Sequence, residues 1–336
     1  MRWSGIHINA GAMALGRRED TAAAVADGRY DPDFHEAHGY RSLCVADGAL
    51  AADLAVEAAR TALRRCGVDP ADLALVVYAS STPEGPEGIV PAAYLQGKVA
   101  GATVSALEVN QTCNSALAAL ELSAAYAAVA PDGVVLLATS DKHQLSGGER
   151  YRADPGNLDA DGATALVLSR REGVARLLST VVLSDGRYND IALLDASSFP
   201  DRPAFLAEYR RRLKPMTESM SGLRRESIAR ALDEAEVDSA GVNRWVFANV
   251  GRMMIDWGLL KEFDIKESQT TWDWGRTVGH TGTGDQFAGL THLLETGQVH
   301  AGDRIALCGN GVGFSYGCAV IEVGAEPAWE TLGDDA

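Results

Sequence analysis

Cys113 and His280 are the two residues whose type and setting could support covalent catalysis. Cys113 lies in the segment NQTCNSALAAL, between a short apolar run and a helical run that is almost free of charge. A helix N-terminus presents unpaired N–H groups and a partial positive charge, which favour a thiolate and could hold an oxyanion. Free cysteine is also among the most buried residue types, so a core thiol is the alternative interpretation of Cys113.

His280 stands in the glycine-rich segment TVGHTGTGDQ, directly before a second helical pattern. A histidine there could act as general base toward an incoming hydroxyl and then as acid toward the leaving group. Asp285, five residues later, could orient the imidazole as the third member of a nucleophile–base–orienter set. The alternatives are a histidine that caps the helix and an acid that only complements the helix dipole.

A third candidate element is the segment CGNGVGFSYG (308–317), in which Gly311 and Gly313 allow backbone N–H groups to approach a substrate closely. The spacing of its glycines could be mistaken for a dinucleotide-binding loop. The segment is followed by the strand-like run CAVIEV instead of a helix, which argues against that interpretation.

The elements that would position these residues form a weak internal duplication, 1–173 and 174–336. Each half reads as strand, polar loop, helix, strand, glycine turn and strand, which predicts a layered α/β architecture. Two copies of one unit usually pack face to face, with a site at corresponding loop-to-helix junctions. Those junctions carry Cys113 and His280, which favours the catalytic interpretation of both.

Composition limits the classes of partner. The chain has 336 residues, 46% of them hydrophobic, and a formal charge of −16, which disfavours nucleic acid or an anionic membrane as the main partner. Local arginine patches at 208–214 and 222–230 could still dock an acidic protein, although a solvated helix face is the simpler explanation. The most membrane-like window, 114–130, contains Glu121 and is mostly alanine, so we expect a buried helix there.

The distribution of cysteine and histidine predicts neither a disulfide framework nor a metal site. The five cysteines are scattered without a CxxC pair, and the seven histidines form no HxxxH or HxH spacing. The N-terminus runs directly into strand-like alternation and lacks the long apolar core of a signal peptide. We therefore expect a cytoplasmic protein without a tightly bound cofactor.

Two further segments are candidates for substrate contact. Trp272 and Trp274, in TTWDWGRTVG, could form an aromatic wall for an acceptor, or could pack into the core at a sheet edge. The segment 195–216, rich in aromatic residues and arginine, resembles an insertion over the entrance. It could admit a bulky acceptor or serve as a solvated lid.

In this order and spacing, the motifs resemble the thiolase-fold condensing enzymes, specifically the ketoacyl-ACP synthase III family. EVNQTCNSAL is similar to that family's nucleophile segment, DGATALVLS to its mid-chain strand, and GNGVGFSYGCAVIE to its terminal glycine signature. The resemblance implies a thiolase-like α/β fold of two pseudo-duplicated halves with stacked mixed sheets around buried helices, usually as a homodimer. It also implies that Cys113 is acylated by a thioester on acyl carrier protein or coenzyme A, with the N–H groups of Cys113 and Val312 as the oxyanion hole.

The departures from the family pattern concern the other catalytic positions. Asn249 stands where the family keeps a histidine, and His280 stands where it keeps an asparagine. Ala37 and Met254 occupy places where the family tends to have arginines that bind the coenzyme A nucleotide or the carrier protein, which weakens the case for coenzyme A as donor. With Asp285 behind His280, the set resembles Cys–His–Asp, which suits deprotonation of an alcohol or amine.

The resemblance therefore narrows to the synthase III-like acyltransferases of antibiotic and polyketide pathways, with Asn249 and Asp285 positioning His280 or the acceptor. Such an enzyme passes the acyl group to a hydroxyl or a carrier thiol without forming a carbon–carbon bond. A decarboxylative ketoacyl synthase is the second hypothesis. A non-catalytic synthase partner is the third, and the presence of Cys113 and His280 together argues against it. A cysteine hydrolase of another fold, with water as the acceptor, is a remote fourth.

Overall fold

The computed structural model describes residues 1–48, 50–82, 85–86, 88–101, 103–130, 132–143, 149–154, 156–194, 198–324, 327 and 329. Within these ranges, most strands join one mixed sheet in the order β5-β4-β6-β7-β1-β8-β11-β10-β9. The sheet strands are β1 (His7–Leu15), β4 (Leu73–Ala79), β5 (Ser105–Val109), β6 (Val134–Asp141), β7 (Gly162–Ser169), β8 (Ala175–Ser184), β9 (Arg244–Val246), β10 (Arg304–Gly311) and β11 (Ser315–Val323). A separate ribbon pairs β2 (Arg17–Asp20) with β3 (Ser42–Val45).

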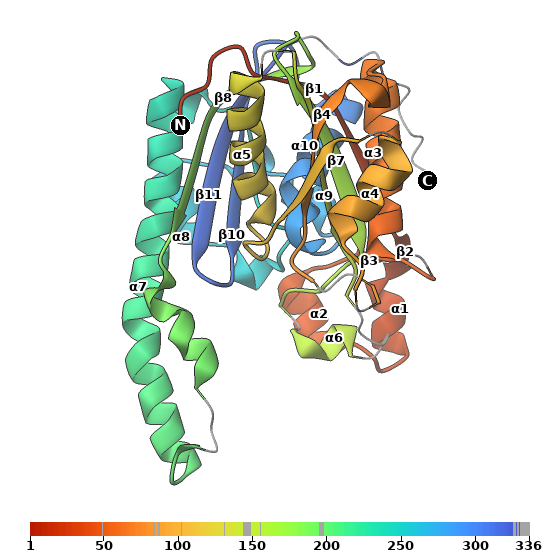
Figure 1. Cartoon of the computed structure of the whole chain (residues 1–336). Coiled ribbons are helices and arrows are strands. Elements are labelled where there is room, and N and C mark those ends of the chain that lie inside the picture. The colour runs from red at the N-terminus through yellow and green to blue at the C-terminus, as the bar shows by residue number, and fades with distance from the viewer. Residues whose placement is uncertain are drawn as a thin grey trace.

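Helices cover the sheet on both faces (Figure 1). They are α1 (Thr21–Ala26), α2 (Pro32–His38), α3 (Ala51–Cys66), α4 (Pro91–Val99), α5 (Ser115–Val129), α6 (Arg150–Ala153), α7 (Arg202–Ala235), α8 (Trp257–Glu262), α9 (Trp272–Gly275) and α10 (Asp285–Glu295). Short 3₁₀ segments used below are η2 (Gly186–Leu193), η5 (Arg252–Met254) and η7 (Gly282–Gly284).

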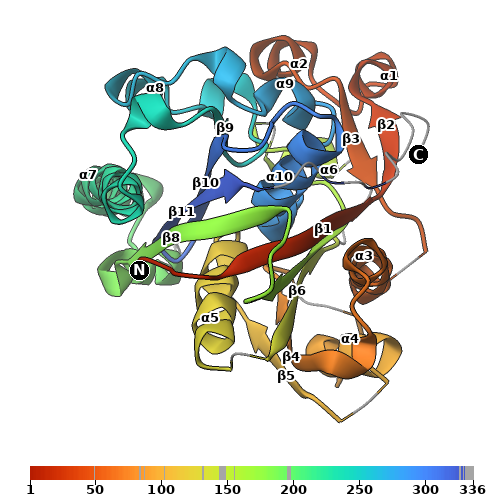
Figure 2. The same ribbon diagram turned by 90° about the horizontal axis from the view of Figure 1, so that it is seen from above.

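The sheet bends at its centre and encloses two helices. Strands β5-β4-β6-β7-β1 and β8-β11-β10-β9 form two arms, joined by the short antiparallel pairing of His7 with Arg176 and Ile8 with Ala175. Helices α5 and α10 contact strands of both arms and lie between them, whereas α3 and α4 cover one outer face and α7 the other (Figure 2). This layering confirms the predicted α/β fold of two stacked halves around buried helices.

The two central helices suit their position because they are apolar on most sides. On α5, small residues such as Ala116, Ala119 and Ala124 are fully buried, which lets both arms approach the helix closely. Helix α10 buries nine of its eleven residues, including Asp285. The window 114–130, expected to be a buried helix, is α5. Across the described ranges, no helix has the length and apolar character needed to cross a lipid bilayer.

Several segments differ from the sequence-based expectation in their local form. Residues 195–197 lie outside the described residues, and the rest of the expected insertion is mostly the first part of α7, a helix of 34 residues. Trp272 and Trp274 lie on the short helix α9 instead of a sheet edge. The predicted limit between the halves, at 173/174, falls in the connection between β7 and β8 and remains a prediction.

Candidate active site

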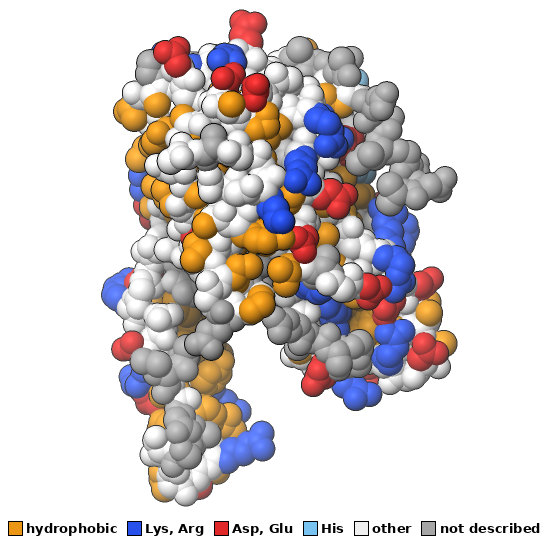
Figure 3. Space-filling model, turned by 45° about the vertical axis from the view of Figure 1, so that its right-hand side comes forward, with side chains coloured by type: hydrophobic (Ala, Val, Ile, Leu, Met, Phe, Trp, Pro, Cys, Tyr) orange, Lys and Arg blue, Asp and Glu red, His pale blue; other side chains and the backbone are white. Residues whose placement is uncertain are grey.

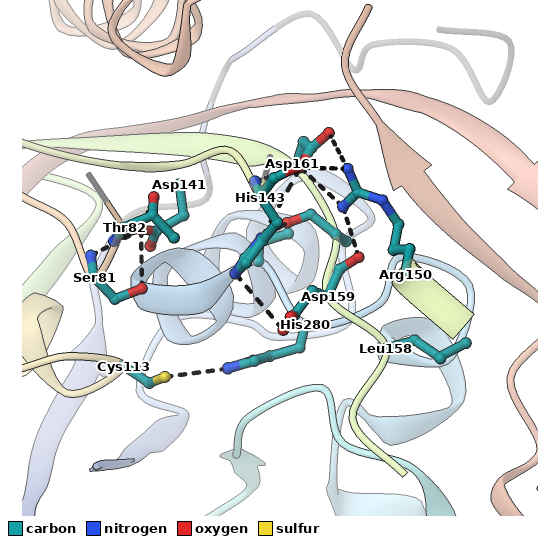
Figure 4. A network of polar contacts seen from close by, with 12 residues as sticks. Ser81, Thr82, Cys113, Asp141, His143, Arg150, Leu158, Asp159, Asp161 and His280 are labelled. Carbon is teal, nitrogen blue, oxygen red and sulfur yellow. Dashed lines mark hydrogen bonds and ion pairs between the residues drawn. The ribbon is translucent and has the colours of Figure 1, made fainter. Parts of the chain in front are cut away.

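Cys113 lies on a tight turn between β5 and α5. The preceding residue, Thr112, has φ of 49°, a left-handed conformation that costs an L side chain roughly 1 kcal/mol or more. Ser115 stabilises this turn, because its N–H donates to Thr112 O at 2.9 Å and its Oγ accepts from Gln111 N at 2.7 Å. The turn holds the half-buried thiol toward His280 (Figure 4).

His280 comes from the other half and is fixed by the first half's main chain. Its N–H donates to Leu158 O at 2.9 Å, and its carbonyl accepts from Ala160 N at 2.8 Å. Gly279 makes this pairing possible, because its φ is 85° and a Cβ there would crowd Ala160. The result is an Nε2–Sγ distance of 3.3 Å between His280 and Cys113, so the two predicted junctions meet.

Asp285 is the orienting group of the imidazole. Its Oδ2 lies 2.6 Å from His280 Nδ1, and the carboxylate is completely buried at the first residue of α10. It also accepts four other hydrogen bonds, from Asn249 N at 2.8 Å, Asn249 Nδ2 at 3.2 Å, Thr281 N at 2.8 Å and Thr281 Oγ1 at 2.8 Å. These donors and the helix N-terminus replace the water that an isolated buried carboxylate would need.

The electrostatic environment favours a protonated His280. Burial is the largest single influence and lowers the pKa of the imidazole, but the charge and hydrogen bond of Asp285, with a further contribution from Cys113, outweigh it. The net result is a pKa well above the ordinary value for histidine. An imidazolium at this distance can donate its Nε2–H to a thiolate on Cys113, and the thiolate is the nucleophilic form of cysteine.

The side-chain amide of Asn249 donates to Asp285 and to a main-chain carbonyl. It is 2% exposed, and its Nδ2 donates to Gly279 O at 3.0 Å and to Asp285 Oδ1 at 3.2 Å. Its Oδ1 packs so closely on Gly275 that a Cβ at that glycine would overlap it. Asp285 therefore assists His280 directly, and Asn249 holds Asp285.

The glycine segment (residues 308–317) lies against the nucleophile turn, which is the turn that carries Cys113 between β5 and α5. Thr112 Oγ1 donates to Val312 O at 2.5 Å, and a Cβ at Gly311 would overlap Gln111 O and Thr112 Oγ1. Gly313 has φ of 96°, which only glycine adopts at low cost. The Val312 side chain is 74% exposed. The assignment of the Cys113 and Val312 N–H groups as the oxyanion hole remains a prediction.

A cavity of about 290 Å³ lies beside the catalytic residues and includes Asn249 in its wall. Its lining is mostly apolar, and Met254 and Trp257 are exposed at its rim. Further lining residues come from α7, the β9 region, α8 and β10, namely Met220, Arg224, Ile228, Phe247, Leu260, Cys308 and Gly309.

The two predicted tryptophans have different settings. Trp272 lines the cavity, but its ring lies beside the guanidinium groups of Arg252 and Arg276, at 5.1 and 5.0 Å from the ring centre. Trp274 is not part of the cavity wall and stacks on His292 with ring centroids 4.5 Å apart. The structure thus places only Trp272 where a substrate could pass.

Two buried carboxylates that the sequence analysis did not single out belong to the polar network near Cys113 and His280 (Figure 4). Asp141, at the end of β6, accepts from Ser81, Thr82 and Thr283, and so connects the first half to the segment that carries His280. Asp161 binds the guanidinium of Arg150 with two bonds of 3.0 and 3.1 Å. An acid at a strand end is the signal that could have found Asp141, although it does not reveal the partners.

The described residues contain no group of three or more histidine, cysteine, aspartate or glutamate side chains that could hold a metal ion.

A layered α/β fold of two stacked halves, with a cysteine on the turn before a buried central helix, defines a thiolase-like enzyme.

Comparison with known proteins identifies the family. Residues 232–323 match the family described as 3-oxoacyl-[acyl-carrier-protein (ACP)] synthase III C terminal. The solved structure of the acyltransferase ChlB3 is 30% identical, with a TM-score of 0.88 over 97% of this chain and 99% of that one. The chain belongs to the ketoacyl-ACP synthase III family and is an enzyme of the transferase type.

The chain also matches curated relatives over most of its length. A beta-ketoacyl-[acyl-carrier-protein] synthase III of Thermosynechococcus vestitus is 27% identical over 80% of this chain and 82% of the relative. The acetoacetyl CoA synthase NphT7 of Streptomyces sp. (strain CL190) is 27% identical over 82% of this chain and 85% of the relative.

Proposed function

We propose that this protein is an acyltransferase that takes an acyl group from a carrier-protein or coenzyme A thioester onto Cys113 and passes it to a hydroxyl or a carrier thiol. It forms no carbon–carbon bond, and it acts in secondary metabolism. The name acyltransferase that ChlB3 carries supports this proposal.

The observation that carries the proposal is the arrangement of Asn249 and Asp285 around His280. Decarboxylative condensation needs positioned donors for an enolate that develops on a bound malonyl carbonyl. Here the Asn249 amide donates to Gly279 O and Asp285, so it is committed to the support of the carboxylate. What remains beside Cys113 is a single imidazole backed by a carboxylate, a set suited to removing a proton from an acceptor.

The reaction has two half-reactions that share one imidazole. In the first, the Cys113 thiolate attacks the donor carbonyl, the donor thiolate leaves, and His280 supplies the proton that converts it to a thiol. In the second, neutral His280 removes the acceptor proton while the acceptor oxygen or sulfur attacks the acyl-cysteine. The Cys113 thiolate is then released next to the imidazolium, which restores the starting ion pair.

The second candidate is a decarboxylative synthase, which the names of the curated relatives favour. Intact-protein mass spectrometry separates the two candidates. The protein is incubated with acetyl, butyryl and benzoyl thioesters of a bacterial acyl carrier protein and of coenzyme A, and then with a panel of alcohols. The proposal expects an acyl adduct on Cys113 that an acceptor removes, and no adduct in Cys113→Ala.

Release of carbon dioxide from malonyl-carrier protein that depends on Cys113, with formation of a ketoacyl product, would establish the synthase instead. Full product formation by Cys113→Ala would favour a non-catalytic role. The absence of an adduct from every donor would refute the covalent mechanism.

A further inference from the structure

Helix α7 extends past the body of the molecule as a positively charged arm, here called the α7 arm (residues 202–219). Its segment 202–214 contains four arginines and a lysine against the single acid Glu208. With Glu218 included, the whole arm carries a charge of +3, which leaves −19 for the rest of the chain. The arm stands clear of the body and borders a wide hollow (Figures 1 and 3).

Part of the charge on the arm is free to attract a partner. Arg211 and Arg212 both bind Glu208, at 2.7 Å, whereas Arg202 and Arg210 are exposed and form no ion pair with the described residues. Tyr209, which is 37% exposed, lies among these cations and stacks on Phe205. The arm thus combines unpaired cations with an exposed aromatic ring, which is the composition of an interface centre.

The body holds the C-terminal part of the arm in place. Ser219 Oγ donates to Asp185 Oδ2 at 2.9 Å, just before η2. A small apolar cluster fastens the helix to η2 and the glycine segment, and its members are Met216, Phe314, Tyr316, Tyr188, Ile191, Leu213, Met220 and Leu223. A partner bound to the arm would therefore keep a defined position relative to the catalytic residues.

The same helix forms the wall of the cavity beside the catalytic residues. Met220 and Arg224 line this cavity, and Arg210 is ten residues before Met220, about 15 Å along the helix axis. The cations of the arm therefore lie on the same helix as the residues that line the cavity beside Asn249.

We propose that the α7 arm is the docking site for an acidic carrier protein that delivers the acyl thioester. This inference rests on the proposed function and adds the surface that recognises the donor. Charge complementarity selects the occupant, because the rest of the chain, with a charge of −19, would repel an acidic domain at most other places, whereas the arm attracts one. The cavity beside the arm then receives the thioester.

The test compares Arg202→Glu/Arg210→Glu with Arg60→Glu/Arg64→Glu. Neither change in the arm breaks an ion pair seen in the structure. Arg60 and Arg64 are exposed on α3, on the opposite outer face, so the control alters the net charge equally (Figure 2). Each variant is given the same acyl group on bacterial acyl carrier protein and on N-acetylcysteamine, and the rate of adduct formation on Cys113 is measured by mass spectrometry at two salt concentrations.

For the arm variant with the carrier-bound donor, the expected result is a loss of about tenfold or more in kcat/KM. This loss becomes smaller at high salt, because salt screens the attraction between the arm and the carrier protein. Its rate with N-acetylcysteamine thioester and all rates of the α3 control stay unchanged. The proposal is overturned by an equal loss with both donors, by an equal loss in the control, or by no loss with the carrier-bound donor. A changed oligomeric state of the arm variant in size-exclusion chromatography would assign the arm to contact between copies of this chain and would also overturn it.

If no donor acylates Cys113, the proposed function fails, and docking is tested by fluorescence anisotropy of labelled holo-acyl carrier protein. Binding to the wild type that is weakened only in the arm variant supports the docking site. Equal binding by both variants refutes it.

Discussion

Replacement of Asp285 by asparagine tests the catalytic assignment most directly. The carboxylate lies 2.6 Å from His280 Nδ1, so the charge centres of the ion pair are about 4 Å apart, which corresponds to about 4 kcal/mol at an effective dielectric constant near 20. Asparagine removes this charge and can leave the imidazole in the wrong tautomer. We expect acyl transfer to slow by about 10³-fold, since about 1.4 kcal/mol corresponds to one decade in rate.

The pH dependence should change together with the rate. In the wild type, neutral His280 accumulates only as the pH rises through its raised pKa, so transfer to the acceptor increases along an acidic limb. Without the Asp285 charge, burial lowers the pKa with much less opposition. The acidic limb of Asp285→Asn should therefore move to lower pH.

The assay is a single-turnover chase. Acyl-enzyme is formed with an excess of thioester, desalted, and mixed with the alcohol that reacts fastest in the acceptor panel, and loss of the adduct is followed by mass spectrometry between pH 5 and 9. Asp141→Asn is the matched control, because Asp141 is equally buried but its partners are Ser81, Thr82 and Thr283. A rate for Asp285→Asn within threefold of the wild type, with an unmoved limb, would refute the role of His280 as the base.

Three other substitutions have defined outcomes. Gly311→Ala should destabilise the protein by about 1–3 kcal/mol in urea denaturation and slow adduct formation, because the new Cβ overlaps the nucleophile turn, whereas Gly186→Ala has open space and should be neutral. Asn249→Ala should lower the free energy of unfolding by about 1–3 kcal/mol, yet the variant should still form the acyl adduct in mass spectrometry. Loss of the adduct in a folded variant would contradict the assignment of Asn249 as a support for Asp285. Arg150→Met should cost about 3–5 kcal/mol in the same denaturation assay, because it removes the guanidinium paired with the buried Asp161 carboxylate, and an unchanged midpoint would contradict this account.

The sequence was sufficient to predict the layered fold and the meeting of Cys113 with His280. Both follow from repeated strand–helix order and from the position of each residue directly before a helix that becomes buried. Asp285 was also within reach of sequence reasoning, since it follows His280 by five residues and opens α10. The relation between His280 and Asp285 can be predicted because it depends on a single turn and the start of a single helix.

The roles that depend on contacts between distant segments were not predictable. The partner of the Asn249 side chain, either the Cys113 sulfur or the Asp285 carboxylate, depends on the packing of Asn249 against Gly275. Trp274 stacks on His292 and so does not line the cavity. For the segment that forms the α7 arm, the sequence left two interpretations open, an insertion that admits a bulky acceptor and a solvated lid, because a pattern of arginine and aromatic residues does not define the direction of a helix. Each of these outcomes is decided by three-dimensional packing.

The hydrogen bonds of His280 with Leu158 and Ala160 have a mechanical consequence for the catalytic cycle. They attach His280 to the main chain of the segment before β7, in the half that carries Cys113, although His280 lies 167 residues after Cys113. The 3.3 Å distance between Cys113 Sγ and His280 Nε2 is therefore set by main-chain hydrogen bonds and not by side-chain packing alone. Turnover therefore does not require repeated assembly and loss of the Cys113–His280 pair.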